Sequence, residues 1–367
     1  FSDNAKYDLE SAGEYTQGAG GGALLIRHNP RLISIPDRWG VSTSPVHDFF
    51  KPRREVSIKS VISHVVQLAR ETGASIKEGM VDRMVRHLPE STVRRMGIFS
   101  HGVDSVQVHR DEPVFDGQFS NQCYQDAVEE AFRDFRAKAE ADGRWDAEGE
   151  TVLTEDWARI IMHLPYAFQA KRMFPAVFAY ERRGSASWTD VEAEIGLPPS
   201  IDDFDDTPEG QAEHAKAMDG YRRSISKTQA YREFHAERIE KGQRASSLIG
   251  NQYTGSIFLA MMSTFESDYE ADSPLDGRQF GLCGYGSGAK AKVFEGVVSD
   301  RWREVVASWN LFERMAGRMA IDQVTYELLH KGIHDGSVLK PRGEFALVEI
   351  EGGEGELEGA RTYAWVE

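Results

Sequence analysis

An apolar run that ends at a histidine is the clearest pattern of hydrophobic and polar positions in the chain. Residues 160–162 are Ile, Ile and Met, and they lead directly into His163, which predicts a short buried strand that stops at the histidine. Pro165 then interrupts the backbone, and helix-forming residues that include Lys171 and Arg172 follow. A histidine at this position is well placed to meet an anionic or carbonyl-bearing ligand. The pattern leaves open a second interpretation, in which the histidine only bonds the backbone at the edge of a core.

Other segments carry helical and strand patterns, which together predict an α/β protein. Apolar spacing predicts a helix from about 122 to 139, with Ser120 as its cap. Asn251 can cap a strongly apolar, buried helix that includes 257–262. The remaining patterns predict strands at 23–26, 280–284 and 292–298, a late helix at 321–327, and a terminal hairpin of 345–350 and 361–366.

Residues 53–111 differ from their surroundings in pattern and charge. Apolar residues recur at helical spacing over 58–69 and 76–88, and Ser91 can cap a third short helix, so we predict an inserted helical subdomain. The segment holds ten Lys/Arg against seven Asp/Glu, a net charge of +3 in a chain of net charge -16. Two roles stay open: a packing or dimer-contact insert, or a cationic flap that favours the approach of an anionic substrate.

Composition limits the classes of protein to which the chain can belong. Its 367 residues are 40% hydrophobic and 28% charged, with a mean hydropathy of -0.48, which is typical of a soluble globular protein without a membrane span. Two cysteines cannot form a disulfide framework and favour a cytoplasmic location. The net charge of -16 opposes nucleic-acid binding. The scattered histidines of 53–111 predict no metal site, and residues 190–213, with nine acidic side chains and no Lys or Arg, predict a solvated acidic loop.

Candidate chemistry is concentrated in motifs that follow one another in a fixed order. Val-His-Asp-Phe-Phe-Lys-Pro at 46–52 and Asp-Gly-Gln-Phe-Ser at 116–120 precede the run around His163. Gly-Asn-Gln-Tyr-Thr-Gly-Ser at 250–256 and Tyr-Gly-Ser-Gly at 285–288 come after it. These motifs and their order resemble those of the 3-hydroxy-3-methylglutaryl-CoA synthases, a branch of the thiolase superfamily.

The resemblance implies a thiolase-like αβαβα layered fold. Residues 1–52 would be the end of the N-terminal half, 53–111 the inserted helical subdomain, and 112–367 the C-terminal half, with an acidic variable region at about 183–245. The family's acylated cysteine and its glutamate lie upstream of the position that matches Phe1. We therefore expect the chain to need a polypeptide that carries this Cys and Glu.

The resemblance also implies roles for individual residues. His163 would polarise the carbonyl of the acceptor and exchange its proton. Asn251 and Ser287 would orient thioester and acyl oxygens, and Gly286 would let the backbone approach a ligand closely. Thr16 and Ser120 would line the acyl pocket, Asp3 and Asp48 would tune it electrostatically, and Lys171 and Arg172 would contact coenzyme A.

The implied activity is the condensation of acetyl-CoA with acetoacetyl-CoA in the mevalonate route to isoprenoids. Coenzyme A thioesters are then substrates, no cofactor is expected, and the assembly is a homodimer or larger. Cys123 is not expected to be a nucleophile, because it lies inside a predicted helix without an adjacent base. Phe168 stands where the family has a lysine, which keeps open a β-branching synthase whose acceptor is bound to a carrier protein. A non-catalytic subunit of a condensing-enzyme complex is a further alternative.

Overall fold

The computed structural model describes residues 2–73, 77, 79, 83, 105–109, 112–143, 152–334, 336–352 and 357–367. The chain divides into two units. The first comprises Phe1–Lys51 and Asp111–Ala316, and the second comprises Pro52–Arg110 and Gly317–Glu367. The domain boundaries predicted from the family resemblance stay a prediction.

The core of the first unit is a mixed sheet built around a long hairpin. β10 (Gln279–Gly286) and β11 (Lys290–Val298) pair antiparallel and confirm the strands predicted at 280–284 and 292–298. β9 (Trp157–Met162) pairs parallel to the other edge of β10, with Met162 opposite Cys283. β3 (Ile33–Ser34) and β4 (Trp39–Thr43) both pair with the free edge of β11. The predicted strand before His163 is confirmed, and the histidine follows directly from the sheet.

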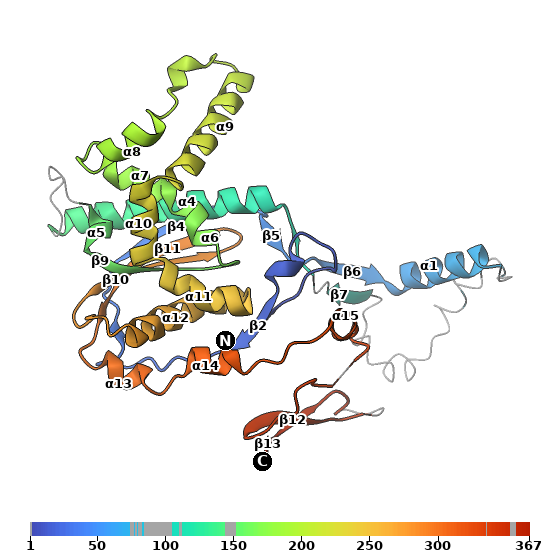
Figure 1. The fold of residues 1–367 in the computed structure, drawn as a ribbon. Helices are drawn as coiled ribbons and strands as arrows, with labels where there is room; N and C mark the ends of the chain where they lie inside the picture. Colours follow the sequence, from blue (N-terminus) through green and yellow to red (C-terminus); the bar gives the residue numbers. More distant parts are fainter. Residues whose placement is uncertain are drawn as a thin grey trace. The chain divides into compact units, whose positions relative to one another are not determined.

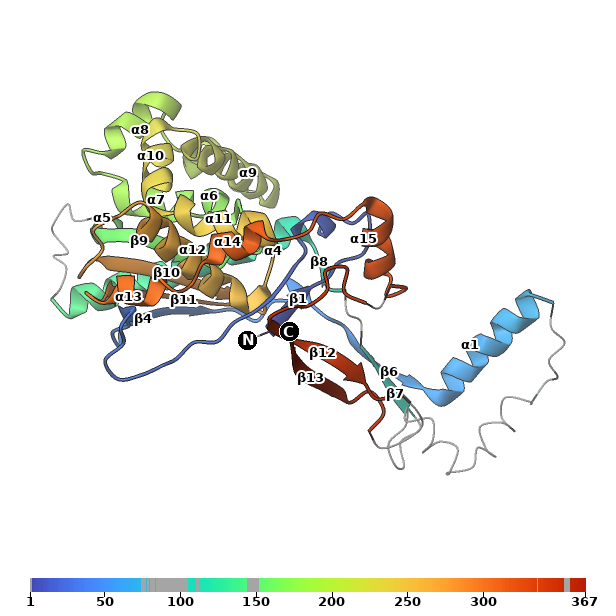
Figure 2. The ribbon, with the colours of Figure 1, turned by 60° about the horizontal axis from the view of Figure 1, so that its bottom comes forward.

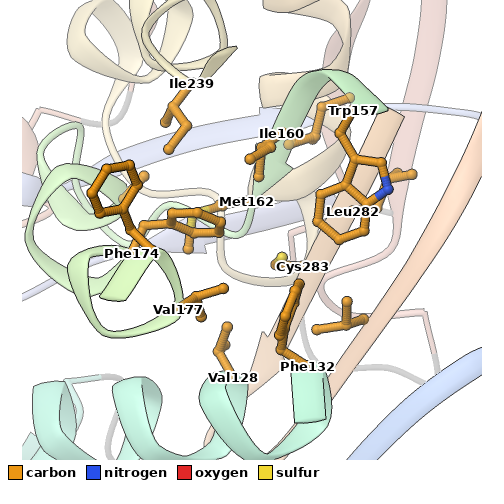
Figure 3. Packing of buried hydrophobic residues seen from close by; sticks show 14 of the residues in the cluster. Val128, Phe132, Trp157, Ile160, Met162, Phe174, Val177, Ile239, Leu282 and Cys283 are labelled. Atoms are coloured by element: carbon orange, nitrogen blue, oxygen red, sulfur yellow. The ribbon is translucent and has the colours of Figure 1, made fainter. Parts of the chain in front are cut away.

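Helices cover both faces of this sheet (Figure 1). On one face, α4 (Gly117–Ala141) places the Phe132 ring 5.8 Å from the Trp157 ring of β9. On the other face, α12 (Ser256–Glu270) places the Phe265 ring 5.1 Å from the Phe280 ring of β10. Figure 2 shows the same layers from a second side, and Figure 3 shows Phe132 directed toward the strands that carry Trp157 and Cys283. Both helices were predicted, and their apolar stripes explain why they pack on the sheet.

A buried carboxylate ties β9 to the helices beneath it. Asp268 of α12 is 0% exposed and accepts two hydrogen bonds from Arg159, at 2.8 and 2.6 Å. Lys241 also pairs with Asp268, from α11 (Glu240–Ile249). Burial opposes ionisation of Asp268, but the hydrogen bonds from Arg159 and Lys241 outweigh it and lower the pKa of this carboxyl. The pairing fixes the strand that leads to His163.

Between β9 and α12 the chain is rich in helices, and the acidic loop predicted at 190–213 is confirmed only in its middle: α8 (Trp188–Ile195) and α9 (Pro208–Ile225) contain its two ends, and residues 196–207, which include one short turn of 3-10 helix, connect them. Thr207 caps α9 through a hydrogen bond from the Gly210 N–H at 3.1 Å, and Pro208 follows as its first residue. Acidic side chains in the first turn of a helix are stabilised there by the helix dipole, so the charge that suggested a loop is compatible with helix starts. The helices in this region are α6 (Gln169–Met173), α7 (Pro175–Arg182), α8 (Trp188–Ile195), η2 (Ile201–Asp203), α9 (Pro208–Ile225), α10 (Gln229–Arg238) and α11.

Two local predictions near the start of the chain and of α4 are wrong. Residues 23–26 form no strand, and Leu25 and Ile26 are 83% and 93% exposed. An apolar run becomes a strand only where a neighbour completes its hydrogen bonds, and β2 (Gly18–Gly21), which pairs with β1 (Ser2–Ala5), ends before it. α4 is capped by Asp116, which accepts from the Gln118 and Phe119 N–H groups, and not by Ser120.

The second unit contains the predicted insert and the terminal hairpin. α1 (Ile58–Glu71) confirms the first helix predicted for the insert, and Ser57 caps it. An antiparallel pair that the sequence did not predict, β6 (Arg53–Ser57) with β7 (Ser105–His109), frames the segment. The second and third predicted helices fall largely outside the described residues. α15 (Gln323–His330) matches the predicted late helix, and β12 (Glu344–Ile350) and β13 (Arg361–Val366) form the predicted hairpin.

The remaining short elements belong to the first unit. They are η1 (Glu14–Thr16), β5 (Phe49–Phe50), β8 (Val114–Phe115), α5 (Leu153–Asp156), η3 (Tyr253–Gly255), α13 (Trp302–Val306) and α14 (Leu311–Ala316).

Across the ranges described above, the structure contains no helix with the length and apolar character needed to cross a bilayer.

Candidate active site

The backbone of His163 is held from two sides. Its N–H donates to the Cys283 carbonyl oxygen at 3.0 Å, which extends the ladder between β9 and β10 by one residue. Its carbonyl oxygen accepts from the Tyr124 hydroxyl of α4 at 2.8 Å. Tyr124 is itself 2% exposed. The position of the histidine is therefore set by the sheet and by one covering helix.

The imidazole of His163 lies against the first residue of α12. Its Nδ1 is 2.5 Å from the Ser256 Oγ, and the same oxygen accepts from the Leu164 N–H at 3.1 Å. The side chain is buried, and burial lowers the pKa of His163 to about 4. The ring is therefore neutral near pH 7, with one N–H and one lone pair. A neutral imidazole can donate a hydrogen bond to a carbonyl oxygen.

Asp48 reaches the surroundings of His163 through a tyrosine. The carboxylate is 0% exposed, and its Oδ2 accepts from the Tyr285 hydroxyl at 2.6 Å. Its Oδ1 accepts from the Gly288 N–H at 2.8 Å, in the turn between β10 and β11. The Tyr285 ring lies 6.3 Å from the His163 ring, centroid to centroid. Burial, followed by the hydrogen bond and charge of Asp48, raises the pKa of Tyr285 well above its ordinary value.

Asn251 organises the turn that precedes α12. It is 3% exposed, and its Oδ1 accepts from the Tyr253 N–H at 2.8 Å. The backbone N–H of Asn251 donates to the Thr16 carbonyl oxygen at 2.9 Å, and the side-chain Nδ2 donates to the Tyr7 hydroxyl at 3.3 Å. The amide oxygen thus stabilises the turn at η3. α12 itself begins after Gly255 without a side-chain cap, so Asn251 does not cap this helix, the simpler of the two roles open to it.

The backbone around Asn251 packs tightly against the end of β2. A Cβ on Gly18 would lie 2.5 Å from the Asn251 carbonyl oxygen. Gly250 has φ of +89°, and a Cβ there would lie 1.9 Å from the Gln17 carbonyl oxygen. Both positions require glycine, because any side chain there would clash with the backbone that faces it.

Aromatic rings connect the group around Asn251 with Asp48. The Phe49 ring, next in sequence to Asp48, lies 5.8 Å from the Tyr253 ring and 6.5 Å from the Tyr7 ring. Burial is the largest of the effects that raise the pKa of Tyr253, and the charge of Asp3 on β1 is a smaller one. The role predicted for Asp3 in the acyl pocket stays a prediction.

The other predicted site residues differ in how closely they approach this centre. Thr16 is half-buried and its hydroxyl donates to the Gly13 carbonyl oxygen at 2.7 Å. Ser287 and Gly286 are exposed at the turn after β10, and a hydrogen bond from Ser287 partly offsets the raised pKa of Tyr285. Ser120 is half-buried in the first turn of α4, and Lys171 is half-buried on α6. Arg172 is exposed on α6, and its Nη1 lies 2.9 Å from the Tyr166 hydroxyl. Their assigned roles stay predictions.

Neither cysteine has the environment of a nucleophile. Burial raises the pKa of the Cys283 thiol to about 12, and burial together with the charge of Asp48 raises the pKa of the Cys123 thiol. Both therefore remain thiols near neutral pH. The described ranges contain no cluster of three or more His, Cys, Asp or Glu side chains that could hold a metal ion.

Four side chains of this centre were not predicted: Tyr7, Tyr124, Ser256 and Tyr285. Ser256 and Tyr285 lie inside the motifs at 250–256 and 285–288. The sequence shows that both carry a hydroxyl, but it does not show which groups these hydroxyls contact. Tyr7 and Tyr124 come from distant parts of the chain, and no local signal could have selected them.

The sheet covered by helices on both faces agrees with the thiolase-like fold, and solved hydroxymethylglutaryl-CoA synthases superpose on it. The chain matches the family described as "Hydroxymethylglutaryl-coenzyme A synthase C terminal" over residues 107–333. The chain therefore belongs to the hydroxymethylglutaryl-coenzyme A synthase family, as its motifs suggested.

Individual relatives agree with this assignment. The chain is 25% identical over 372 residues to the hydroxymethylglutaryl-CoA synthase of Haloferax volcanii, covering 100% of this chain and 67% of that protein. An MvaS solved in complex with 3-hydroxy-3-methylglutaryl coenzyme A superposes with a TM-score of 0.63 at 25% identity, covering 100% of this chain and 66% of that one. An HMG synthase of the Curacin pathway, solved in complex with an apo donor-ACP, gives a TM-score of 0.56 at 16% identity, and the match covers 100% of this chain and 65% of that one. The chain thus spans about two thirds of the length of each.

Proposed function

We propose that this chain supplies the His, Asn and Ser side of the active site of a hydroxymethylglutaryl-CoA synthase, which condenses acetyl-CoA with acetoacetyl-CoA. The observation that carries the proposal is the buried, neutral His163, whose Nδ1 lies 2.5 Å from the Ser256 Oγ at the start of the helix that follows Asn251. A rigid, dry imidazole costs little reorganisation when charge develops on a substrate oxygen.

The proposed reaction forms one carbon–carbon bond. A proton leaves the methyl carbon of a cysteine-bound acetyl group, and this carbon attacks the C3 carbonyl of acetoacetyl-CoA. The carbonyl oxygen takes up a proton as the C=O double bond becomes a C–OH single bond, and water then cleaves the thioester to the cysteine. His163 donates to that carbonyl oxygen and exchanges the proton, while Asn251 and Ser287 orient the acyl groups.

The cysteine that carries the acetyl group and the glutamate that removes the proton come, in this proposal, from another polypeptide segment. The raised pKa values of the Cys123 and Cys283 thiols support this division of roles. The exposed apolar side chains at 24–26, three residues beyond β2, offer a surface for such a segment. We also propose a homodimeric or larger assembly and a cytoplasmic location, from the family resemblance and the cysteine content.

A specific observation favours one alternative acceptor. Phe168, at the start of α6, is 66% exposed where the resemblance expects a lysine that contacts coenzyme A. The Curacin pathway neighbour was solved with a donor-ACP. An acceptor bound to a carrier protein, as in β-branching synthases, is therefore the second candidate, and a non-catalytic subunit is the third.

The acceptor is tested with the complete protein that contains this chain. Product formation is followed by mass spectrometry with acetoacetyl-CoA and, in parallel, with acetoacetyl attached to a carrier protein. The proposal expects the higher kcat/KM with acetoacetyl-CoA. The reverse preference would identify a β-branching synthase, and absence of product with both acceptors would favour the non-catalytic subunit.

A further inference from the structure

Ser256 occupies a position from which it can decide the protonation pattern of His163. It is 0% exposed and is the first residue of α12. Its Oγ lies 3.1 Å from the Leu164 backbone nitrogen and 2.5 Å from the His163 Nδ1. The backbone N–H can only donate, so the serine oxygen is the acceptor of that bond.

The hydroxyl hydrogen of Ser256 then needs an acceptor of its own. A hydroxyl carries one hydrogen and two lone pairs, and one lone pair already receives the Leu164 N–H. Of the hydrogen bonds that Ser256 makes within the described structure, only the one to His163 Nδ1 offers an acceptor for this hydrogen. If Nδ1 carried the proton instead, the serine hydrogen would remain unsatisfied in a fully buried site, which is costly.

We propose that Ser256 is a positioning residue that donates its hydroxyl hydrogen to His163 Nδ1 and so holds the imidazole as the tautomer with its N–H on Nε2. Nε2 is then the nitrogen left to donate to a substrate carbonyl oxygen. Donation from Nε2 to a substrate carbonyl oxygen rests on the proposed function, whereas the tautomer of His163 does not.

Other contacts make the assignment well defined. The backbone of His163 is fixed by the Cys283 carbonyl oxygen at 3.0 Å and by the Tyr124 hydroxyl at 2.8 Å, so the ring has little freedom apart from rotation about its own side-chain bonds. The bond to Ser256 restricts that rotation. Burial keeps the ring neutral around pH 7, where one tautomer must be chosen. Fixing one ring nitrogen in order to orient the other is a general device for placing imidazoles.

The direct test is the tautomer of His163 in the complete protein, labelled with ¹⁵N-histidine. Nitrogen chemical shifts distinguish a protonated ring nitrogen from a bare one, and the His163→Gln variant identifies the signals of His163. The proposal expects a bare Nδ1 and a protonated Nε2 in the native protein. A protonated Nδ1 would overturn it without reference to any activity.

A matched pair of serine variants separates positioning from general damage to α12. Ser263 is also 0% exposed on this helix, and its Oγ accepts from the Ala245 N–H at 3.1 Å and donates to the Lys241 carbonyl oxygen at 2.6 Å. Ser263→Ala therefore removes the same atom and the same number of bonds as Ser256→Ala, away from His163. We expect Ser256→Ala to mix the two tautomers of His163 and Ser263→Ala to leave the native tautomer unchanged. Equal spectra for both variants would overturn the proposal.

Kinetics distinguish failure of this inference from failure of the proposed function. Ser256→Ala is expected to lower kcat for condensation by about tenfold, the population change that loss of one neutral hydrogen bond produces, with KM nearly unchanged. Ser263→Ala is expected to keep the native kcat. If the native protein shows the expected tautomer but makes no product, the proposed function fails and the tautomer assignment stands. If product forms normally in Ser256→Ala, the positioning role fails.

Discussion

Replacing His163 should change how the stability of the protein depends on pH. Burial lowers the pKa of His163 to about 4, whereas a histidine in the unfolded chain titrates near 6.5. Above pH 6.5 the ring is neutral in both states, and its contribution to stability is constant. As the pH falls from about 6.5 to about 4, the unfolded chain binds a proton that the folded protein cannot bind, so stability is lost.

The size of this loss follows from the separation of the two pKa values. A difference of about 2.5 pH units, at about 1.36 kcal/mol each, corresponds to about 3 kcal/mol when the transition is complete, and to about 2 kcal/mol at about pH 5. Below about pH 4 this residue should cause no further loss. The neighbours Tyr124, Tyr285 and Cys283 have raised pKa values and stay neutral throughout this window.

The assay is urea unfolding, followed by tryptophan fluorescence, at a series of pH values between about 4 and 8. The native protein and His163→Gln are compared at each pH, so that the other groups that titrate in this range cancel in the difference. His28→Gln, which removes an exposed histidine, controls for the loss of one titratable group. The free energies of unfolding of native protein and His163→Gln should converge by about 3 kcal/mol as the pH falls. A difference that does not vary with pH would refute the burial of a neutral His163.

Three further predictions concern the carboxylates and the cysteines. Asp48→Asn should lower the free energy of unfolding by about 2 kcal/mol, because the hydrogen bond from the Tyr285 hydroxyl to a charged acceptor is lost. The same variant should lower the pKa of Tyr285 in an alkaline absorbance titration, and an unchanged titration would contradict the contact. Asp268→Asn should cost about 3 kcal/mol in urea unfolding, since it leaves an arginine and a lysine without their buried partner, and a neutral effect would mean that these pairs add no stability. The chain alone, incubated with radiolabelled acetyl-CoA, should take up no stable label. Label on Cys123 or Cys283 would contradict the division of the site between two segments.

Periodicity predicted the elements whose pattern is set by their own burial. The strand before His163, the helices α4 and α12, and the hairpin of β10 and β11 each have an apolar stripe or run that only a core can satisfy. The predicted strand at 23–26 failed because a strand also needs a neighbour, which the apolar run itself cannot reveal. The loop prediction at 190–213 was right for 196–207 and wrong for the two ends of the segment, because Thr207 and Pro208 provide a helix start that the acidic composition did not reveal.

The site was predicted only where a motif carried it. His163, Asn251 and Asp48 were selected through the family resemblance, and the structure places them in or beside one network of hydrogen bonds and rings. The tyrosines that join them could not be selected, because Tyr7 and Tyr124 meet the motifs only after the chain has folded. Ser256 shows the limit most clearly: the sequence contained the residue, but only the distance to His163 Nδ1 gives it a role.

The most direct test of the central claim separates acetyl transfer from condensation in a single turnover. The complete protein, native or His163→Gln, is acetylated with radiolabelled acetyl-CoA and then mixed with acetoacetyl-CoA. We expect both proteins to form the acetyl-enzyme, and His163→Gln to convert it to product about 10²–10⁴-fold more slowly, the range typical of a lost general acid–base group. Equal loss of acetylation and condensation, or normal condensation in the variant, would contradict the assignment of His163 to the condensation step.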